Sequence, residues 1–224
     1  MRTFITKVIL FIALAAIGTA GTLTFVGSVG ALGSNDSFDW DTAAPGLPPM
    51  SSVPYVEGTA LTTMNGVQFT ASNPTDTLSF SNNPAFTSSS GGTDVFLLSD
   101  IQDPQWIRID LSSPVMGFGA APEWGGGEVA TYTMDVYGAG NTLLGSTNVN
   151  SDSSGDPVFM GVNDTAPEIT AVMFTLTGPT APHSAALGDL YLVDGPASIP
   201  EPATLLLVGP ALLGSLLLKR RAAR

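Results

Sequence analysis

The chain contains no cysteine and only one histidine, His183. Without cysteine, no disulfide stabilises the fold, and no thiolate serves as a nucleophile or a metal ligand. A single histidine also excludes transition-metal sites built from several imidazoles. A Ser-His-Asp triad would have to use His183, and the central part of the chain has no Gly-x-Ser-x-Gly elbow to carry the serine. These absences favour a non-enzymatic protein.

Positive charge is almost missing from the middle of the chain. Between Leu32 and Ile199 the only basic residue is Arg108, whereas 18 of the 19 acidic residues lie there, which gives this interval a net charge of −17. Such a surface argues against binding to nucleic acid or to anionic membranes, both of which need basic patches. Calcium is the credible ion, because Asp152 and Asp156 place carboxylates in one tight loop. No other cofactor is expected.

The N-terminus has the pattern of a secretory signal. Two basic residues, Arg2 and Lys7, precede an apolar run that ends near Ala20. Small residues before Ala20 and before Ala31 mark two candidate cleavage sites. The stretch from Thr22 to Val29 is also apolar, and we favour cleavage after Ala31. The signal peptide is therefore predicted at residues 1–31, and the chain is predicted to be exported.

The C-terminus carries a second apolar stretch. Residues 203–218 contain no charged side chain, and as a helix they would span roughly 24 Å, against about 30 Å for a hydrocarbon core. We predict a transmembrane helix here, with Lys219, Arg220 and Arg221 as a basic stop on the cytoplasmic side. On hydropathy alone, a simple tail anchor explains this pattern equally well.

A rigid acidic tripeptide, Pro200-Glu201-Pro202, precedes this stretch. Each proline fixes its own φ and restricts the residue before it, so the tripeptide is extended and stiff. Tripeptide, leucine-rich span and arginine-rich end together resemble the PEP-CTERM sorting signal of Gram-negative bacteria. The resemblance implies recognition and removal of the tail by an exosortase, a membrane processing enzyme. It makes Pro200, Glu201 and Pro202 a sorting motif without a catalytic role. It also implies a cell-surface or matrix protein that accompanies exopolysaccharide.

Between the two ends, the sequence has strand patterns. Ile107, Ile109 and Leu111 alternate with polar residues, and further alternation runs through residues 131–136 and 171–176. Gly138 to Asn141 is predicted to turn a hairpin. Further short strands are predicted at residues 67–70, 77–80, 95–98, 115–119, 143–148, 158–162 and 187–193. We therefore predict an all-β fold: a single β-sandwich or jelly roll over residues 32–194, then a linker over 195–199 and the sorting signal over 200–224. Residues 35–41 and 45–57 are expected to form an extended arm.

Several short segments resemble the galactose-binding-like sandwich domains common among PEP-CTERM proteins. They are Ser37–Asp39, Asn65–Phe69, Ser113–Gly119, Val136–Gly145 and Ala186–Leu192. The resemblance implies a galactose-binding-like β-sandwich ectodomain.

One segment invites comparison with sugar chemistry. Glu123 and Glu128 flank Trp124 and three glycines, and a glycosidase needs two carboxylates across a sugar-sized gap. Trp124 is equally a candidate stacking platform for a sugar ring, or a core residue. The sequence thus predicts a non-enzymatic exported protein, associated with the membrane through its tail. The alternative is a secreted glycosidase that uses Glu123 and Glu128.

Overall fold

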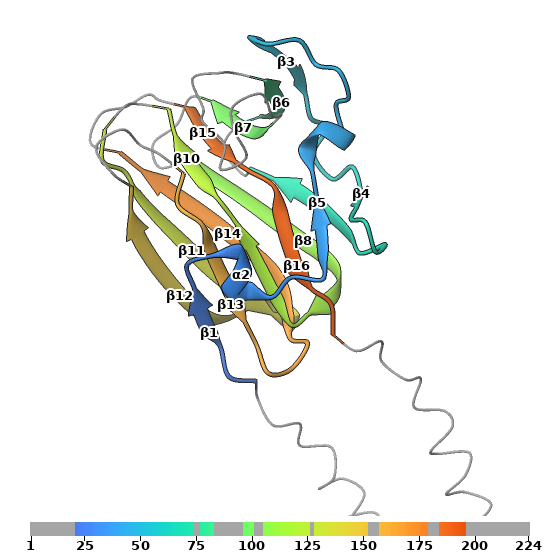
Figure 1. Ribbon diagram of the computed structural model, residues 1–224, viewed down its shortest axis with the longest axis vertical. Coiled ribbons are helices and arrows are strands. Elements are labelled where there is room, and N and C mark those ends of the chain that lie inside the picture. Colours follow the sequence, from blue (N-terminus) through green and yellow to red (C-terminus); the bar gives the residue numbers. More distant parts are fainter. Residues whose placement is uncertain are drawn as a thin grey trace, which may run out of the picture. The chain divides into compact units, whose positions relative to one another are not determined.

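Strands dominate the structure, a computed structural model that describes residues 21–73, 77–82, 96–100, 105–125, 128–151, 157–178 and 184–195. The chain divides into two units, Met1–Asp194 and Gly195–Arg224, and almost everything described belongs to the first. The fold is all-β, as predicted (Figure 1). Residues 1–20 and 196–224, which carry most of the predicted signal peptide and the sorting tail, lie outside the described residues.

The largest sheet, sheet C, has six antiparallel strands. Their order is β12 (Thr142–Asn150), β11 (Thr131–Gly138), β14 (Ile169–Thr177), β8 (Gln105–Val115), β5 (Gln68–Ser72) and β4 (Leu61–Thr62). Along β11, the side chains of Tyr132, Met134 and Val136 are buried, and those between them are not. The alternation read from the sequence is therefore confirmed, because successive side chains of a strand point to opposite faces. The hairpin is confirmed too: β11 and β12 are joined by η2 (Ala139–Asn141).

Two five-stranded sheets lie opposite sheet C. Sheet A has the order β1 (Thr24–Val26), β13 (Met160–Asn163), β9 (Gly117–Ala120), β16 (Leu190–Val193) and β2 (Asp36–Phe38). Sheet B has the order β10 (Pro122–Trp124), β15 (Ser184–Leu187), β7 (Phe96–Asp100), β6 (Leu78–Asn82) and β3 (Ser51–Pro54).

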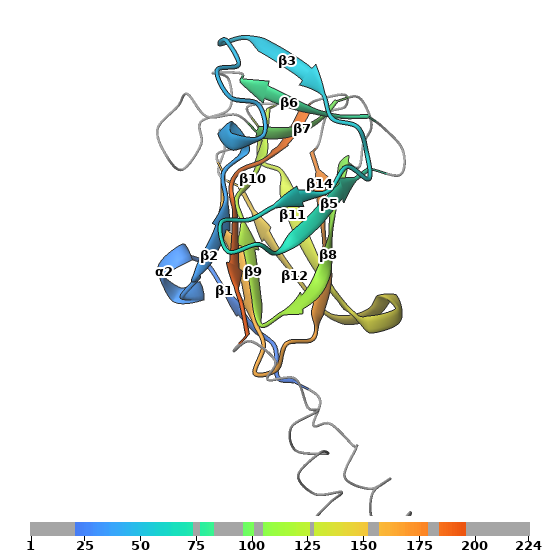
Figure 2. The same cartoon turned by 90° about the vertical axis from the view of Figure 1, so that its right-hand side faces the viewer.

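Sheets A and B join at one irregularity. A single residue, Ala121, separates β9 from β10, and the Gly188 N–H, between β15 and β16, donates to the carbonyl of Ala121 at 3.0 Å. The pairing moves by one residue across this point, from Gly119↔Tyr191 to Pro122↔Leu187. Such a bulge bends a sheet. The two sheets therefore form one bent layer, and Figure 2 shows β1, β2 and β9 on one side and β8, β12 and β14 on the other.

Aromatic side chains fill much of the space between the layers. Phe69 of β5 meets Phe38 of β2 edge to face, with ring centroids 4.9 Å apart. Trp40 meets the same Phe38 at 5.1 Å and is fully buried, and its indole N–H donates to the carbonyl of Gly188 at 2.9 Å. Edge-to-face rings attract one another beyond the area that they bury. This cluster ties the segment around Trp40 to both layers.

The predicted extended arm is therefore wrong. Residues 35–57 hold β2, the short 3-10 helix η1 (Trp40–Thr42) and β3, and β2 pairs with β16. The carboxylate of Asp36 is buried and accepts the backbone N–H groups of Ser37 and Asn65, each at 2.8 Å. Local polarity and proline content suggested an arm, but long-range pairing with β16 decides the structure of this segment.

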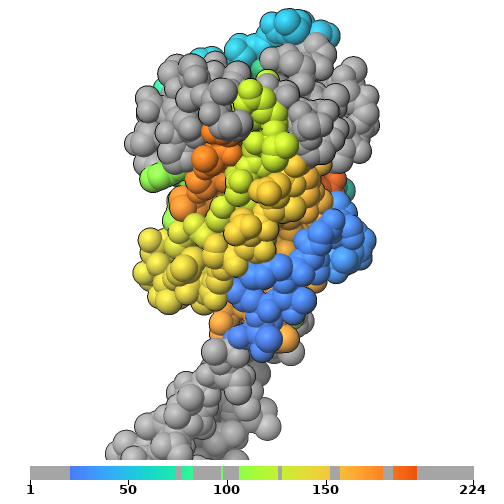
Figure 3. All heavy atoms as spheres, turned by 90° about the vertical axis from the view of Figure 1, so that its left-hand side faces the viewer, coloured from blue at the N-terminus to red at the C-terminus, as the bar shows by residue number. Residues whose placement is uncertain are grey.

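The described fold also begins before Leu32, the start predicted from the sequence. β1 pairs with β13, and Ser28 caps the helical turn α2 (Val29–Leu32) by accepting the Ala31 N–H at 3.2 Å. Leu32 is 3% exposed. Figure 3 shows this N-terminal segment, in blue, lying against the yellow strand β12.

Candidate functional site

Several residues singled out from the sequence lie outside the described residues. They are His183, the calcium candidates Asp152 and Asp156, the sorting motif Pro200, Glu201 and Pro202, and the basic stop Lys219, Arg220 and Arg221. In the described part of the chain, no helix has the length and apolar character needed to cross a bilayer. The described residues likewise hold no cluster of three or more acidic or histidine side chains suited to a metal ion.

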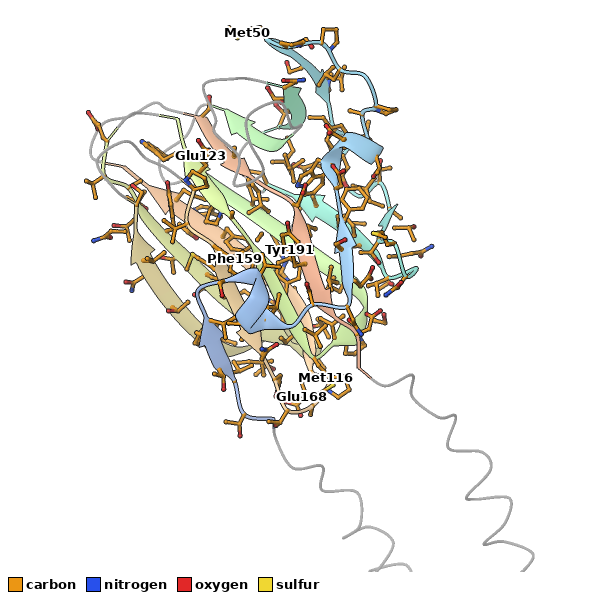
Figure 4. All side chains as sticks on the ribbon, viewed as in Figure 1. Met50, Met116, Glu123, Phe159, Glu168 and Tyr191 are labelled. Atoms are coloured by element: carbon orange, nitrogen blue, oxygen red, sulfur yellow. The ribbon has the colours of Figure 1, made fainter. Side chains whose placement is uncertain are left out.

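Glu123 and Trp124, the candidates for sugar chemistry, lie on β10 and are buried. Glu123 is 4% exposed and Trp124 is 1% exposed, while Glu128 is half-buried (Figure 4 labels Glu123). The backbone N–H of Trp124 donates to the hydroxyl of Tyr132 at 3.0 Å, which joins β10 to β11 of the opposite sheet. The indole of Trp124 is thus a core side chain and offers no free face to a sugar ring.

The outer face of sheet C carries the one cation of the central interval. Arg108 lies on β8 between the buried Ile107 and Ile109, so its side chain points away from the core. Its Nη2 lies 2.8 Å from Oδ1 of Asp110, and its Nε lies 2.9 Å from the same oxygen. The same Nη2 donates to Oδ1 of Asn141 at 2.8 Å. The guanidinium is thus fixed in one orientation.

An aromatic ring lies under this guanidinium. The Cζ of Arg108 is 5.0 Å from the ring centroid of Tyr137 on β11, a cation–π distance. The hydrogen bond to Asp110 is the main cause that raises the pKa of Arg108, so the group is charged at every accessible pH. Partial burial, and then the charge of Asp135, raise the pKa of Tyr137, which keeps its hydroxyl protonated and able to donate.

Pairing across the sheet surrounds Arg108 with further partly exposed side chains. Arg108 pairs with Met173 of β14 and with Ser72 of β5. Two residues earlier in β8, Trp106 pairs with Thr175 of β14. We call this surface the Arg108 face and define it by Trp106, Arg108, Asp110, Asp135, Tyr137, Asn141, Met173 and Thr175. It combines two partly exposed aromatic rings with hydrogen-bonding side chains on the outer face of sheet C.

Two shallow grooves lie elsewhere. One of about 250 Å³ is mostly apolar and runs between β1 and β12, lined by Phe25, Val149 and Phe159 among others. The other, about 260 Å³, is lined by Asn35, Asp36 and their neighbours. The backbone N–H of Asp194 donates to Asn35, and burial and the nearby charge of Asp36 raise the pKa of the Asp194 carboxyl. Neither groove pairs an exposed aromatic ring with a fixed cation as the Arg108 face does.

One residue in the sequence points to this face. Arg108 is the only basic residue of the central interval, and it alternates with inward isoleucines in a strand that was predicted. Tyr137 could not be assigned to the same face, because the register of β8, β14 and β11 follows only from the structure.

Comparison with known proteins gives solved structures alone. No protein-family model and no curated protein matches the chain. Solved structures that it resembles include the module TmCBM61 in complex with β-1,4-galactotriose, with a TM-score of 0.40 and 13% identity over 57% of this chain and 88% of that one. A DUF4465 family protein from Bacteroides caccae gives 0.38 and 10% over 78% and 100%. The CBM32 of AlyQ in complex with 4,5-unsaturated mannuronic acid gives 0.34 and 15% over 64% and 99%. These values transfer no ligand and no activity to this chain.

Proposed function

We propose that this chain is an exported, non-enzymatic carbohydrate-binding protein of the cell surface or extracellular matrix, and that the Arg108 face is its glycan-binding surface. Export rests on the signal pattern of residues 1–20, and surface delivery rests on the sorting pattern of residues 200–224. The observation that carries the binding function is the fixed guanidinium over Tyr137, beside Asp110 and Asn141.

A sugar ring has an apolar face and a rim of hydroxyl groups. Partly exposed Trp106 offers apolar ring surface to the first, beside the Arg108–Tyr137 pair, while Asp110, Asp135 and Asn141 offer oxygen acceptors to the second. Arg108 is held by three side chains before any ligand arrives, so little side-chain entropy is lost on binding. An open sheet face suits an extended polysaccharide better than a short sugar in a pocket.

Charge indicates a neutral polysaccharide. The interval from Leu32 to Ile199 has a net charge of −17, and its one cation is paired with Asp110. An anionic polymer would therefore be repelled over most of the surface, and salt would be needed to screen this repulsion. We expect binding of neutral glycans that changes little between low and high salt.

The test is binding of the exported chain to immobilised neutral and anionic polysaccharides, with calcium and again with EDTA. Tyr137→Ala should weaken binding by about tenfold, because it removes the ring that holds the Arg108 guanidinium, and truncation of an aromatic residue that anchors an interface costs more than about 1 kcal/mol. The matched control is Met64→Ala, since Met64 is 83% exposed and lies outside the face. Equal affinity of both variants would refute the Arg108 face. Loss of binding in EDTA would direct attention to Asp152 and Asp156.

The same preparation tests the alternative of a glycosidase. We expect no release of reducing ends from any bound polysaccharide, because Glu123 is buried beneath the sheet surface. Hydrolysis that disappears in Glu123→Gln would overturn the non-enzymatic proposal.

For the tail, we propose processing at Pro200-Glu201-Pro202 by an exosortase-type enzyme. Recovery of intact residues 203–224 from the native surface protein would contradict it.

A further inference from the structure

The first described residues are fastened to the sandwich. The backbone N–H of Gly21 donates to Oε2 of Glu168 at 3.2 Å, and that of Thr22 donates to Oγ1 of Thr165 at 3.0 Å. From Thr24 onward the chain pairs with β13. Figure 4 labels Glu168 at the end of the sandwich where the coloured ribbon begins. Gly21, the first described residue, is therefore already in contact with the fold.

Gly21 lies against two carboxyl groups. Besides Glu168, it lies so close to Asp164 that a Cβ built on Gly21 would come within 1.8 Å of the Asp164 Oδ1. Asp164 is 6% exposed, and its Oδ1 also accepts the Ala166 N–H at 3.2 Å, so this carboxylate has little room to move. Only glycine fits at position 21.

A charged N-terminus would suit this place better than a peptide amide. An ammonium group carries a full positive charge and three donors, and its hydrogen bonds to carboxylates are stronger than those of a neutral N–H. The domain has a large excess of carboxylates, and its one cation, Arg108, is paired with Asp110. The pair Asp164 and Glu168 is thus a site for a cation that the intact precursor does not supply.

We propose that a signal peptidase cuts the chain between Ala20 and Gly21, and that the new ammonium group of Gly21 docks against Glu168 and Asp164. Water hydrolyses the peptide bond: its oxygen completes the carboxylate of Ala20, and the Gly21 nitrogen leaves as an amine that is protonated at neutral pH. Gly18 and Ala20 supply the small residues that such an enzyme reads before the cut. Cleavage precedes docking, on the unfolded chain at the membrane.

The site after Ala31 would remove folded structure. It would delete β1, the edge strand of sheet A that pairs with β13, and most of the turn α2 that follows. On this sheet, Phe159 packs over Gly119 and Gly161, where added Cβ atoms would lie 2.5 and 2.8 Å from its ring, and the ring meets Tyr191 at 5.9 Å (Figure 4). Val26 of β1 reaches the same Gly161, at 2.9 Å from its Cβ position. Cleavage after Ala20 keeps β1 and this contact.

The first experiment is N-terminal sequencing and intact mass of the full chain after export in a bacterial host and extraction in mild detergent. We expect Gly21-Thr22-Leu23 at the N-terminus. A start at Leu32 would overturn the proposal and leave the glycan-binding function standing. An intact Met1 would overturn both the cleavage and the signal-peptide route of export.

The second experiment tests docking by a double-mutant cycle. Two chains are prepared, one with Gly21 and one with Ala20 as its first residue, and both continue to Arg224. Each is made with Glu168 unchanged and with Glu168→Gln. We expect Glu168→Gln to lower Tm by about 2–4 °C more in the chain that starts at Gly21 than in the chain that starts at Ala20. Glu57→Gln is the matched control, because Glu57 also accepts one backbone N–H, from Asn73 at 3.0 Å. It should act equally in both chains. If Glu168→Gln also lowers Tm equally in both chains, docking is refuted.

Discussion

The bond between the Tyr132 hydroxyl and the Trp124 N–H allows a sharp test of how the two layers are held together. Tyr132 is fully buried, and its hydroxyl accepts the amide of a residue in the opposite sheet at 3.0 Å. Tyr132→Phe removes one oxygen and leaves the ring in place. The Trp124 amide then loses this acceptor in a site that water does not reach, which costs about 1–3 kcal/mol of unfolding free energy. For a domain of this size, that corresponds to a fall in Tm of about 2–12 °C.

The matched control is Tyr137→Phe on the same strand. Tyr137 points to the outer face, so loss of its hydroxyl should change the unfolding free energy by less than about 0.5 kcal/mol. Urea unfolding followed by the fluorescence of the three tryptophans measures both variants, and calorimetry gives the two Tm values. If both variants lose the same stability, or neither loses any, the bond between the layers does not stabilise the fold and the reasoning fails.

Two further substitutions test other parts of the fold. Gly178→Ala would place a Cβ 2.4 Å from Cζ2 of Trp124, a rigid ring in the core, and should cost about 1–3 kcal/mol in urea unfolding; an unchanged midpoint would mean that the indole moves aside freely. Asp194→Asn should raise Tm at pH 7. Burial, and next the charge of Asp36, raise the pKa of Asp194, so the folded state binds its proton more tightly than the unfolded state does. The cost of ionising Asp194 is therefore present above its folded pKa and disappears as the pH falls through that pKa towards the unfolded value, where the two proteins should converge. A Tm difference that persists in acid would contradict this assignment.

Strands with regular alternation could be predicted from the sequence, because burial of one face leaves a local pattern. The inward residues of β8, β11 and β14 follow it closely. The first strand could not be found in this way. Residues 22–29 are apolar whether they extend a signal peptide or form an edge strand, and the partners of β1, Phe159 and β13, lie more than a hundred positions later.

The position of Trp124 shows the same limit. The sequence leaves Trp124 open as a stacking platform for a sugar ring or as a core residue. In the structure, Gly178 leaves the space that the indole occupies, and β10 lies over β14 of sheet C. The Arg108 face likewise depends on register between strands that are distant in sequence. Sequence patterns show which residues of a strand share a face, whereas the pairing of strands determines which faces meet.

The place of β16 in sheet A has a consequence for how the protein is made. This strand is the last one before Gly195, yet it lies between β9 and β2 in the interior of its sheet. A chain is synthesised from its N-terminus onward, so sheet A stays incomplete until Val193 has emerged. Pairing of strands so far apart in sequence is slow, because the intervening loops must close first. Sheet A therefore cannot be completed until its last described strand is available for pairing.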